Sequence, residues 1–261
     1  MRRLGRNKGG YFGETINLVE VLREIEVTAS AHGWQSEDFL HFGSLRLFAL
    51  NRIGDARGQP RGPRVYLSTG IHGDEPAGPL AALRLLRENQ WPTGCDYWFC
   101  PCLNPAGFIL NRRENGKGTD LNRDYRHLQS AEIRAHTGWL ERQPEFDYCF
   151  CLHEDWEAHG FYVYELNPDN RPSLAERMIE EVARVCPIDS SEVIEGREAK
   201  DGIIRPNLDP QTRPEWPEAF WLITHKTRMS YTLESPSDFP LNTRVDALVR
   251  GVQAALRTLA H

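Results

Sequence analysis

The chain has 261 residues, of which 40% are hydrophobic and 26% are charged, and its formal net charge is −6. This length allows a sizeable core without disulfides or metals, and the composition is typical of a globular domain. The acidic balance argues against a nucleic-acid partner, and no run approaches the roughly 18 apolar residues that a membrane span requires.

The predicted elements begin after a basic segment, MRRLGRNKGG, that no apolar stretch follows. We therefore expect a flexible tail of about ten residues rather than a signal peptide, and a Pro/Gly-rich loop at residues 54–64. Helical spacing of apolar residues predicts a helix in INLVEVLREI. Further strands are predicted at 44–50, 64–70, 95–103, 146–152, 161–166 and 229–235, and further helices at 76–89, 131–142, 173–185 and 241–259. This alternation predicts an α/β fold, with a mixed, largely parallel twisted sheet flanked by helices, as a single domain over residues 1–261.

The cysteines give no sign of a secreted disulfide framework. Four of the six form C-x-C pairs inside apolar runs, which is typical of buried, reduced core cysteines, and neither pair has the C-x₂-C spacing of a structural zinc site. The six are Cys95, Cys100, Cys102, Cys149, Cys151 and Cys186. A reducing, cytoplasmic location is the expectation.

Polar residues gather at the ends of three predicted strands. His72 and Glu75 follow RVYLSTG, His153 and Glu154 follow FDYCFCL, and Glu234 lies at the end of MSYTL. In α/β folds function gathers at such strand ends. Catalytic zinc needs about three His and carboxylate ligands, and a further carboxylate can serve as a general base. Polar turns after strands are common, however, so each pair alone is a weak signal.

A long Gly- and Asn-rich segment, Asn104–Tyr125, supplies arginines beside these strand ends. The planar guanidinium group suits bidentate binding of a carboxylate. A solvated loop is the alternative. The arginines are Arg112, Arg113, Arg123 and Arg126.

Taken in order, these motifs resemble those of the M14 zinc metallocarboxypeptidases. The chain has H-x-x-E from His72, N-P-x-G-F from Asn104, and R-x-N-x-x-G-x-D-L-N-R from Arg113. Strands ending in L-H and T-L-E follow, with His153 and Glu234. The resemblance spans residues 65–236, about two thirds of the chain.

The resemblance implies one zinc ion per chain, bound by His72, Glu75 and His153, with Asp120 orienting His72. It also implies that Glu234 is the general base and then the acid that protonates the leaving amine.

The same resemblance also implies functions for residues of the Asn104–Tyr125 segment. It implies that Arg113 stabilises the oxyanion, and that Asn122 and Arg123 hold the terminal carboxylate of a peptide substrate. Arg112 is the alternative oxyanion residue, although Arg113 keeps the family spacing to Asn122. The expected activity is removal of a C-terminal residue by metal-activated water.

The stretch LHEDWEAHGFYVYEL is similar to a bacterial subgroup of small single-domain M14 enzymes near the murein peptide amidases, with some carboxypeptidase-B-like members. An acidic side-chain pocket formed by Glu215 and Glu218 would favour basic or diaminopimelate-like ends. Two solvent-facing loop charges are the preferred interpretation. The oligomeric state stays open.

The sequence departs from pancreatic-type members in one respect. Those enzymes carry a mobile tyrosine about twenty residues before the catalytic Glu, whereas here no Tyr occurs between Tyr164 and Tyr231. Trp216, Phe220 and Trp221 are the aromatic residues available in that stretch.

Two rival functions follow from the same residues. An aspartoacylase or succinylglutamate-desuccinylase type of amidohydrolase would share the zinc ligands and the base. Those enzymes usually append a C-terminal β domain, for which the residues after Glu234 leave no room, so this function is the less favoured one. An inactive zinc-binding module is the rival from another class, but no ligand or base is lost.

Overall fold

The computed structural model describes residues 3–5, 14–43, 45–54, 62–206, 209 and 213–259. Most of the expected N-terminal tail and of the loop at 54–64 lies outside these residues. The helices are α1 Leu18–Ala31, α2 Ala77–Glu88, α3 Pro105–Leu110, α4 Ala131–Arg142, α5 Ala175–Val182, α6 Glu218–His225 and α7 Leu241–Leu259, with a short 3₁₀ turn, η1, at Leu121–Arg123. The strands are β1 Gln35–Phe42, β2 Leu45–Arg52, β3 Arg64–Thr69, β4 Asp96–Cys100, β5 Tyr148–Asp155, β6 Tyr162–Leu166, β7 Val193–Ile194, β8 Arg197–Lys200, β9 Ile203–Ile204 and β10 Ser230–Pro236.

The described strands form one mixed sheet in the order β1-β2-β4-β3-β5-β10-β6-β9-β8-β7. Its centre is parallel, because β4, β3, β5 and β10 pair in the same direction. Both flanks are mixed or antiparallel. The carboxyl ends of β3, β5 and β10 therefore meet at one edge, where ligand sites of such sheets form. This arrangement confirms the expected fold class.

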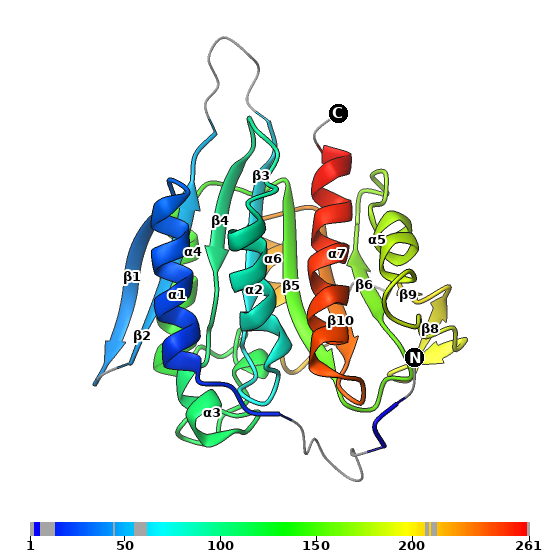
Figure 1. Cartoon of the computed structure of the whole chain (residues 1–261), viewed down its shortest axis with the longest axis horizontal. Coiled ribbons are helices and arrows are strands. Elements are labelled where there is room, and N and C mark those ends of the chain that lie inside the picture. The colour runs from blue at the N-terminus through cyan, green and yellow to red at the C-terminus, as the bar shows by residue number, and fades with distance from the viewer. Residues whose placement is uncertain are drawn as a thin grey trace.

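Helices cover both faces of the sheet (Figure 1). Helices α1, α2, α7 and α5 pack on one face, over a large apolar core. Helices α4 and α6 lie on the other face, over a second core rich in aromatic rings. The apolar side of α7 is buried as its spacing predicts, with Leu248 and Val252 fully covered. None of the described helices combines the length and apolar character needed to cross a membrane.

The structure contains elements that the sequence pattern did not indicate. Strand β1 is polar and largely exposed, since it lies at the sheet edge and pairs only with β2, so it carries no apolar alternation. Helix α3 is too short for helical periodicity to be visible, and it begins inside the segment expected to be a loop. All six cysteines are buried and free, which confirms the prediction made for the four in the C-x-C pairs.

Candidate active site

Three strands position the four central side chains of the site. His72 and Glu75 lie in the turn between β3 and α2, while His153 and Glu234 lie near the carboxyl ends of β5 and β10. His153 is paired directly with Glu234 in the parallel register of these two strands. Residues from distant parts of the sequence thus meet because parallel strands end at the same edge.

Asn104 fixes the turn that carries His72. Its side-chain amide donates to the carbonyl oxygens of Ile71 (3.0 Å) and Arg113 (3.1 Å), and its oxygen accepts from the backbone of Gly107 (2.9 Å). A Cβ atom on Gly73 would lie 2.0 Å from the carbonyl carbon of Gly107, so only glycine fits between the turn and α3. The N-P-A-G-F segment therefore acts as a clamp on the H-x-x-E turn.

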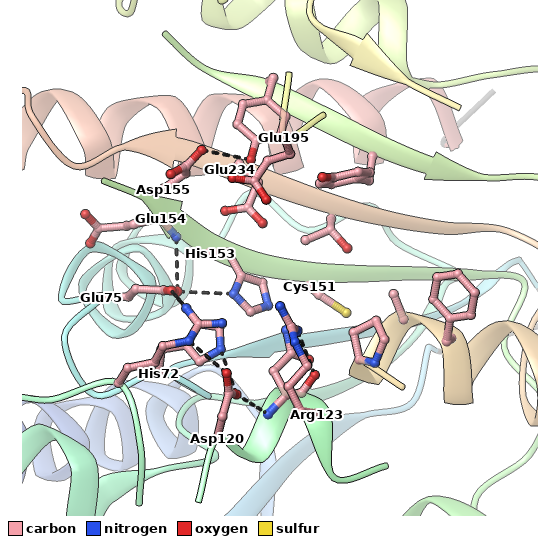
Figure 2. Close-up of a pocket in the computed structure, with 18 of the residues that line it drawn as sticks. His72, Glu75, Asp120, Arg123, Cys151, His153, Glu154, Asp155, Glu195 and Glu234 are labelled. Carbon is pink, nitrogen blue, oxygen red and sulfur yellow. Dashed lines mark hydrogen bonds and ion pairs between the residues drawn. The ribbon is translucent and has the colours of Figure 1, made fainter. Parts of the chain in front are cut away.

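The donor atoms of His72, Glu75 and His153 converge. Each residue offers one atom, and these atoms lie within 4.8 Å of one another; among the described residues this is the one such group of His, Cys, Asp and Glu. The two carboxylate oxygens of Glu75 face the Nδ1 atoms of His72 and His153, at 3.1 Å for His153 (Figure 2). All three side chains are at least nine-tenths buried.

The charges of this group depend on one another. Burial alone would raise the pKa of Glu75, but the neighbouring His72 and His153 hold it well below its usual range. Burial lowers the pKa of His153. At His72 the burial effect is outweighed by Glu75 and Asp120, which raise its pKa.

These residues fit a bound cation. The Nδ1 atom of His72 faces both the Glu75 carboxylate, an acceptor, and the Arg113 guanidinium at 3.3 Å, a donor. One ring nitrogen does not serve both, since it is either protonated or a lone pair. His72, Glu75 and His153 would hold a divalent ion that satisfies the imidazole lone pairs and the carboxylate charge together, and two imidazoles with one carboxylate are a donor set that zinc accepts.

Asp120 and Arg113 flank this group from the Asn104–Tyr125 segment. One Asp120 oxygen lies 3.5 Å from Nε2 of His72, and the other accepts from Nε of Arg113 at 2.8 Å. Burial opposes ionisation of Asp120, but the adjacent His72 and Arg113 keep its pKa well below the usual range. Arg112 instead donates to the carbonyl oxygen of Asn115 and does not line the pocket. Of the two arginines, the structure thus brings Arg113 to the site.

Glu154 is turned away from the pocket centre, because successive side chains of a strand face opposite sides. Its carboxylate accepts from the first amide of α2, at Ala77 (2.6 Å), and from Arg244 of α7 (2.6 Å). Its own amide donates to Glu75 at 3.1 Å. Glu154 therefore links β5, α2 and α7 beside the converging ligands.

Glu234 faces a pocket of about 650 Å³. The converging residues His72, Glu75 and His153 line the same pocket. Figure 2 shows Glu234 and Asp155 on one side of His153 and Arg123 on the other. Burial, followed by the charge of Glu75, raises the pKa of Glu234 well above its usual range. Glu234 can therefore take up and hold a proton.

Asn122 and Arg123 lie in η1 at the pocket wall. The side-chain oxygen of Asn122 accepts from the backbone amide of Glu218 (2.8 Å), the first residue of α6. The Arg123 guanidinium is 46% exposed and lies 3.9 Å from the carboxylate of Glu215.

Glu218 is not the solvent-facing loop charge that the sequence favoured. It is 1% exposed, does not line the pocket, and accepts from Tyr66 and Ser68, each at 2.9 Å. The reason is its place at the start of α6, from where its carboxylate reaches the hydroxyl groups of two residues of β3. Glu215 is largely exposed and does line the pocket.

Several pocket residues were not identified from the sequence. Tyr162 and Tyr164 supply phenol groups from β6, and Arg197 and Arg213 supply guanidinium groups from a hairpin and a loop. Alternation in FYVYEL could have placed both tyrosines on one face. No motif marks the two arginines. Of the three aromatic residues considered for the missing mobile tyrosine, only Phe220 lines the pocket.

Comparisons with known proteins agree with this geometry. Residues 61–185 match the sequence model of the succinylglutamate desuccinylase/aspartoacylase catalytic domain. No curated protein sequence matches the chain.

Solved structures match over most of the chain. A candidate metallopeptidase from Shewanella baltica OS155 has a TM-score of 0.81 at 21% identity, covering 98% of this chain and 100% of that one. One from Shewanella amazonensis SB2B has a TM-score of 0.79 at 22% identity, covering 94% of each chain. The carboxypeptidase A of Helicoverpa armigera has a TM-score of 0.66 at 14% identity, covering 95% of this chain and 74% of its own.

The likeness to these solved structures establishes the fold of the chain. The fold of this chain is the zinc-carboxypeptidase-like fold.

Proposed function

We propose that the protein is a zinc-dependent carboxypeptidase of the M14 type, with a single catalytic domain. It would hydrolyse the amide bond between an acyl group and a terminal amino acid whose carboxylate is free. The observation that carries this proposal is the convergence of His72, Glu75 and His153 in a pocket that also holds Glu234 and Arg113.

His72, Glu75 and His153 would hold the zinc ion. A bound zinc ion polarises a carbonyl group and lowers the pKa of a water molecule towards neutrality. Asp120 would fix the ring of His72, since an acceptor at Nε2 leaves Nδ1 as the ligand atom. The two ring nitrogens of His72 have different roles because Nε2 faces Asp120 and Nδ1 faces Glu75.

Glu234 would act as the general base and then as the general acid. It would accept a proton from the attacking water and return it to the leaving nitrogen. Its burial favours this role, because a raised pKa lets a carboxyl group hold a proton between the two steps.

Arg113 would place positive charge where the carbonyl oxygen becomes negative. Its bond to Asp120 holds the guanidinium group in position before the reaction, which is what makes such charge effective. Asn122 and Arg123 would hold the terminal carboxylate of the substrate. Arg123 is suited to this because its present partner, Glu215, is exposed and distant, and exposed pairs contribute little.

A second candidate is an N-acyl amino acid amidohydrolase, which the family match over residues 61–185 favours. Both activities cleave an acyl group from an amino acid with a free carboxylate. They differ in the acyl side, which is a peptide in one case and a small acid in the other. The same ligands, base and arginines would serve both.

The test is a metal analysis combined with a substrate panel. The panel contains short peptides that differ in the C-terminal residue, a peptide with a diaminopimelate linkage, and N-acetylaspartate, and mass spectrometry identifies the products. We expect stoichiometric zinc, loss of one C-terminal residue, and no product with Glu234→Gln. Cleavage of N-acetylaspartate alone would favour the second candidate. A protein that binds no zinc would refute the site.

A further inference from the structure

Glu218 lies directly behind the wall of the pocket and takes no part in the proposed mechanism. The residues on either side of it, Pro217 and Ala219, line the pocket, whereas Glu218 itself does not. Its backbone amide donates to the side-chain oxygen of Asn122 at 2.8 Å, and its carboxyl group receives a hydrogen bond from the Cys151 thiol. Asn122 and Cys151 line the pocket as well, so Glu218 adjoins the pocket wall on several sides.

The backbone amide of Glu218 fixes the orientation of the Asn122 side chain. Because the side-chain oxygen of Asn122 accepts this hydrogen bond, its amide nitrogen is turned the other way, and no acceptor within the described part of the chain binds that nitrogen. Asn122 lines the pocket, so this nitrogen is the group that can donate to a substrate carboxylate. The bond from Glu218 therefore leaves free the end of the Asn122 amide that an anion requires.

The carboxyl group of Glu218 has no cation to offset its charge. Among the described residues it forms no ion pair, and its hydrogen bonds come from the neutral side chains of Tyr66, Ser68 and Cys151. His136 of α4 lies 2.8 Å from the hydroxyl group of Tyr66, but burial lowers the pKa of His136 to about 3, so its imidazole is uncharged near neutral pH. The other titratable groups around it, from β3, β4, β5 and the segment after η1, are phenols and thiols whose pKa burial raises: Tyr66, Cys100, Tyr125, Cys149 and Cys151.

An ionised Glu218 and a substrate carboxylate at Asn122 would be two like charges on opposite sides of the pocket wall. Salt screens their repulsion only weakly, because the carboxyl group of Glu218 is buried. Burial raises the pKa of Glu218 to about 7, so the group loses its proton within the neutral range. Binding of the anion and ionisation of Glu218 therefore oppose each other, and this coupling is reciprocal.

We infer that Glu218 is a positioning residue for the terminal-carboxylate site: its amide orients Asn122, and its carboxyl group must be uncharged for the substrate carboxylate to bind tightly. The inference rests on the proposed function in taking Asn122 as a ligand of that carboxylate. It makes the affinity for substrate fall as the pH rises through neutrality, independently of the metal ligands and of Glu234.

The first test measures how strongly the zinc-loaded protein binds N-acetylalanine, which has a free carboxylate, by calorimetry at pH 6 and pH 8. Glu218→Gln keeps the backbone amide and the shape of the side chain but removes the titrating charge. Between the two pH values we expect the wild type to lose about three- to tenfold more affinity than Glu218→Gln, as one charge repulsion through a partly polar medium produces. The other titrating groups are common to both proteins and cancel in this comparison.

Two controls isolate the charge of Glu218. The uncharged N-acetylalaninamide should show no difference in pH dependence between the wild type and Glu218→Gln. Glu165→Gln is the matched variant, because Glu165 is a buried carboxylate of β6 that pairs with Arg205 and lies outside the pocket. It should bind N-acetylalanine with the pH dependence of the wild type.

Ser68→Ala provides a second test if Glu218→Gln folds poorly. It removes a donor that stabilises the ionised form of Glu218, so the midpoint of the pH dependence should move to higher pH. The same pH dependence in the wild type and in Glu218→Gln, or a midpoint that Ser68→Ala does not move, would overturn the inference while leaving the proposed hydrolysis intact. Failure of N-acetylalanine to bind at either pH would also overturn it. If the acid binds as expected but no peptide is hydrolysed, the proposed function fails and the inference stands.

Discussion

Two buried carboxylates, one on each face of the sheet, have opposite electrostatic settings. Glu154 is 5% exposed and faces Arg244, a fully buried guanidinium group on α7. Glu218 is 1% exposed and is surrounded by neutral donors, the hydroxyl groups of Tyr66 and Ser68. Glu154 has a fixed counter-ion, whereas among the residues that the structure describes no cation forms an ion pair with Glu218.

The difference shows how similar burial can serve two purposes. Burial raises the pKa of both groups, but Arg244 opposes this at Glu154 and favours a charged pair that ties α7 to β5 and α2. At Glu218 the hydrogen bonds oppose burial only in part, and its pKa rises to about 7. Glu154 therefore belongs to a structural ion pair with Arg244, whereas the pKa of the Glu218 carboxyl group lies near neutrality.

The largest expected effect is that of removing the Glu154 carboxylate. Glu154→Ala should lower the free energy of unfolding by roughly 3 kcal/mol, because it removes the fully buried one of the two carboxylates that pair with Arg244, the other being that of Glu14. Urea denaturation measures the change. The exposed pair of Arg228 and Asp169 is the control, and Asp169→Ala should cost less than about 1 kcal/mol. Equal losses in the two variants would contradict the assignment of Glu154.

The second expected effect is a pH dependence at Glu218. Its folded pKa of about 7 lies above the ordinary value of 4.5, so the folded state binds the proton more tightly than the unfolded state. Its contribution to stability is therefore fully present below pH 4.5 and is lost as the pH rises through 7, by about 3 kcal/mol in total. Glu218→Gln should remove this slope between pH 5 and pH 8 in urea denaturation. A variant with the slope of the wild type would show that Glu218 does not titrate there.

The smallest of the three effects concerns metal affinity. Glu154 holds the start of α2 against the end of β5, and these segments carry Glu75 and His153. Glu154→Gln should therefore weaken zinc binding about tenfold, as loss of an outer contact of a metal site typically does. Glu218→Gln should leave the affinity unchanged. Competition with a chromophoric chelator measures the zinc affinity of both variants. Equal affinities in the wild type and in Glu154→Gln would show that Glu154 does not support the metal ligands.

Much of the candidate site could be predicted because its residues belong to short motifs beside strong strands. His72 and Glu75 follow a strand that is buried apart from its first residue, and His153 and Glu234 end two others, so the apolar runs locate them. Their convergence follows from parallel pairing alone. The zinc ion and the role of each residue remain predictions.

The outer pocket could not be predicted in the same way. Arg197 and Arg213 lie in a short hairpin and a loop that have no periodic pattern, and only their packing against Tyr164 and Phe220 brings them to the pocket. Glu218 was misjudged for a related reason. A charged residue beside prolines resembles a surface loop, unless the helix that follows turns it into the core.

The sequence by itself determined the alternation of strands and helices, the buried cysteines and the residues at the strand ends, because these depend on local apolar patterning and chain order. Only the tertiary structure decided which charged groups have partners. Glu154 faces Arg244 across 90 residues of chain, and Glu218 reaches Ser68 across 150. Such pairings depend on how the sheet and its helices pack, since the state of a buried charge is set by what surrounds it in space.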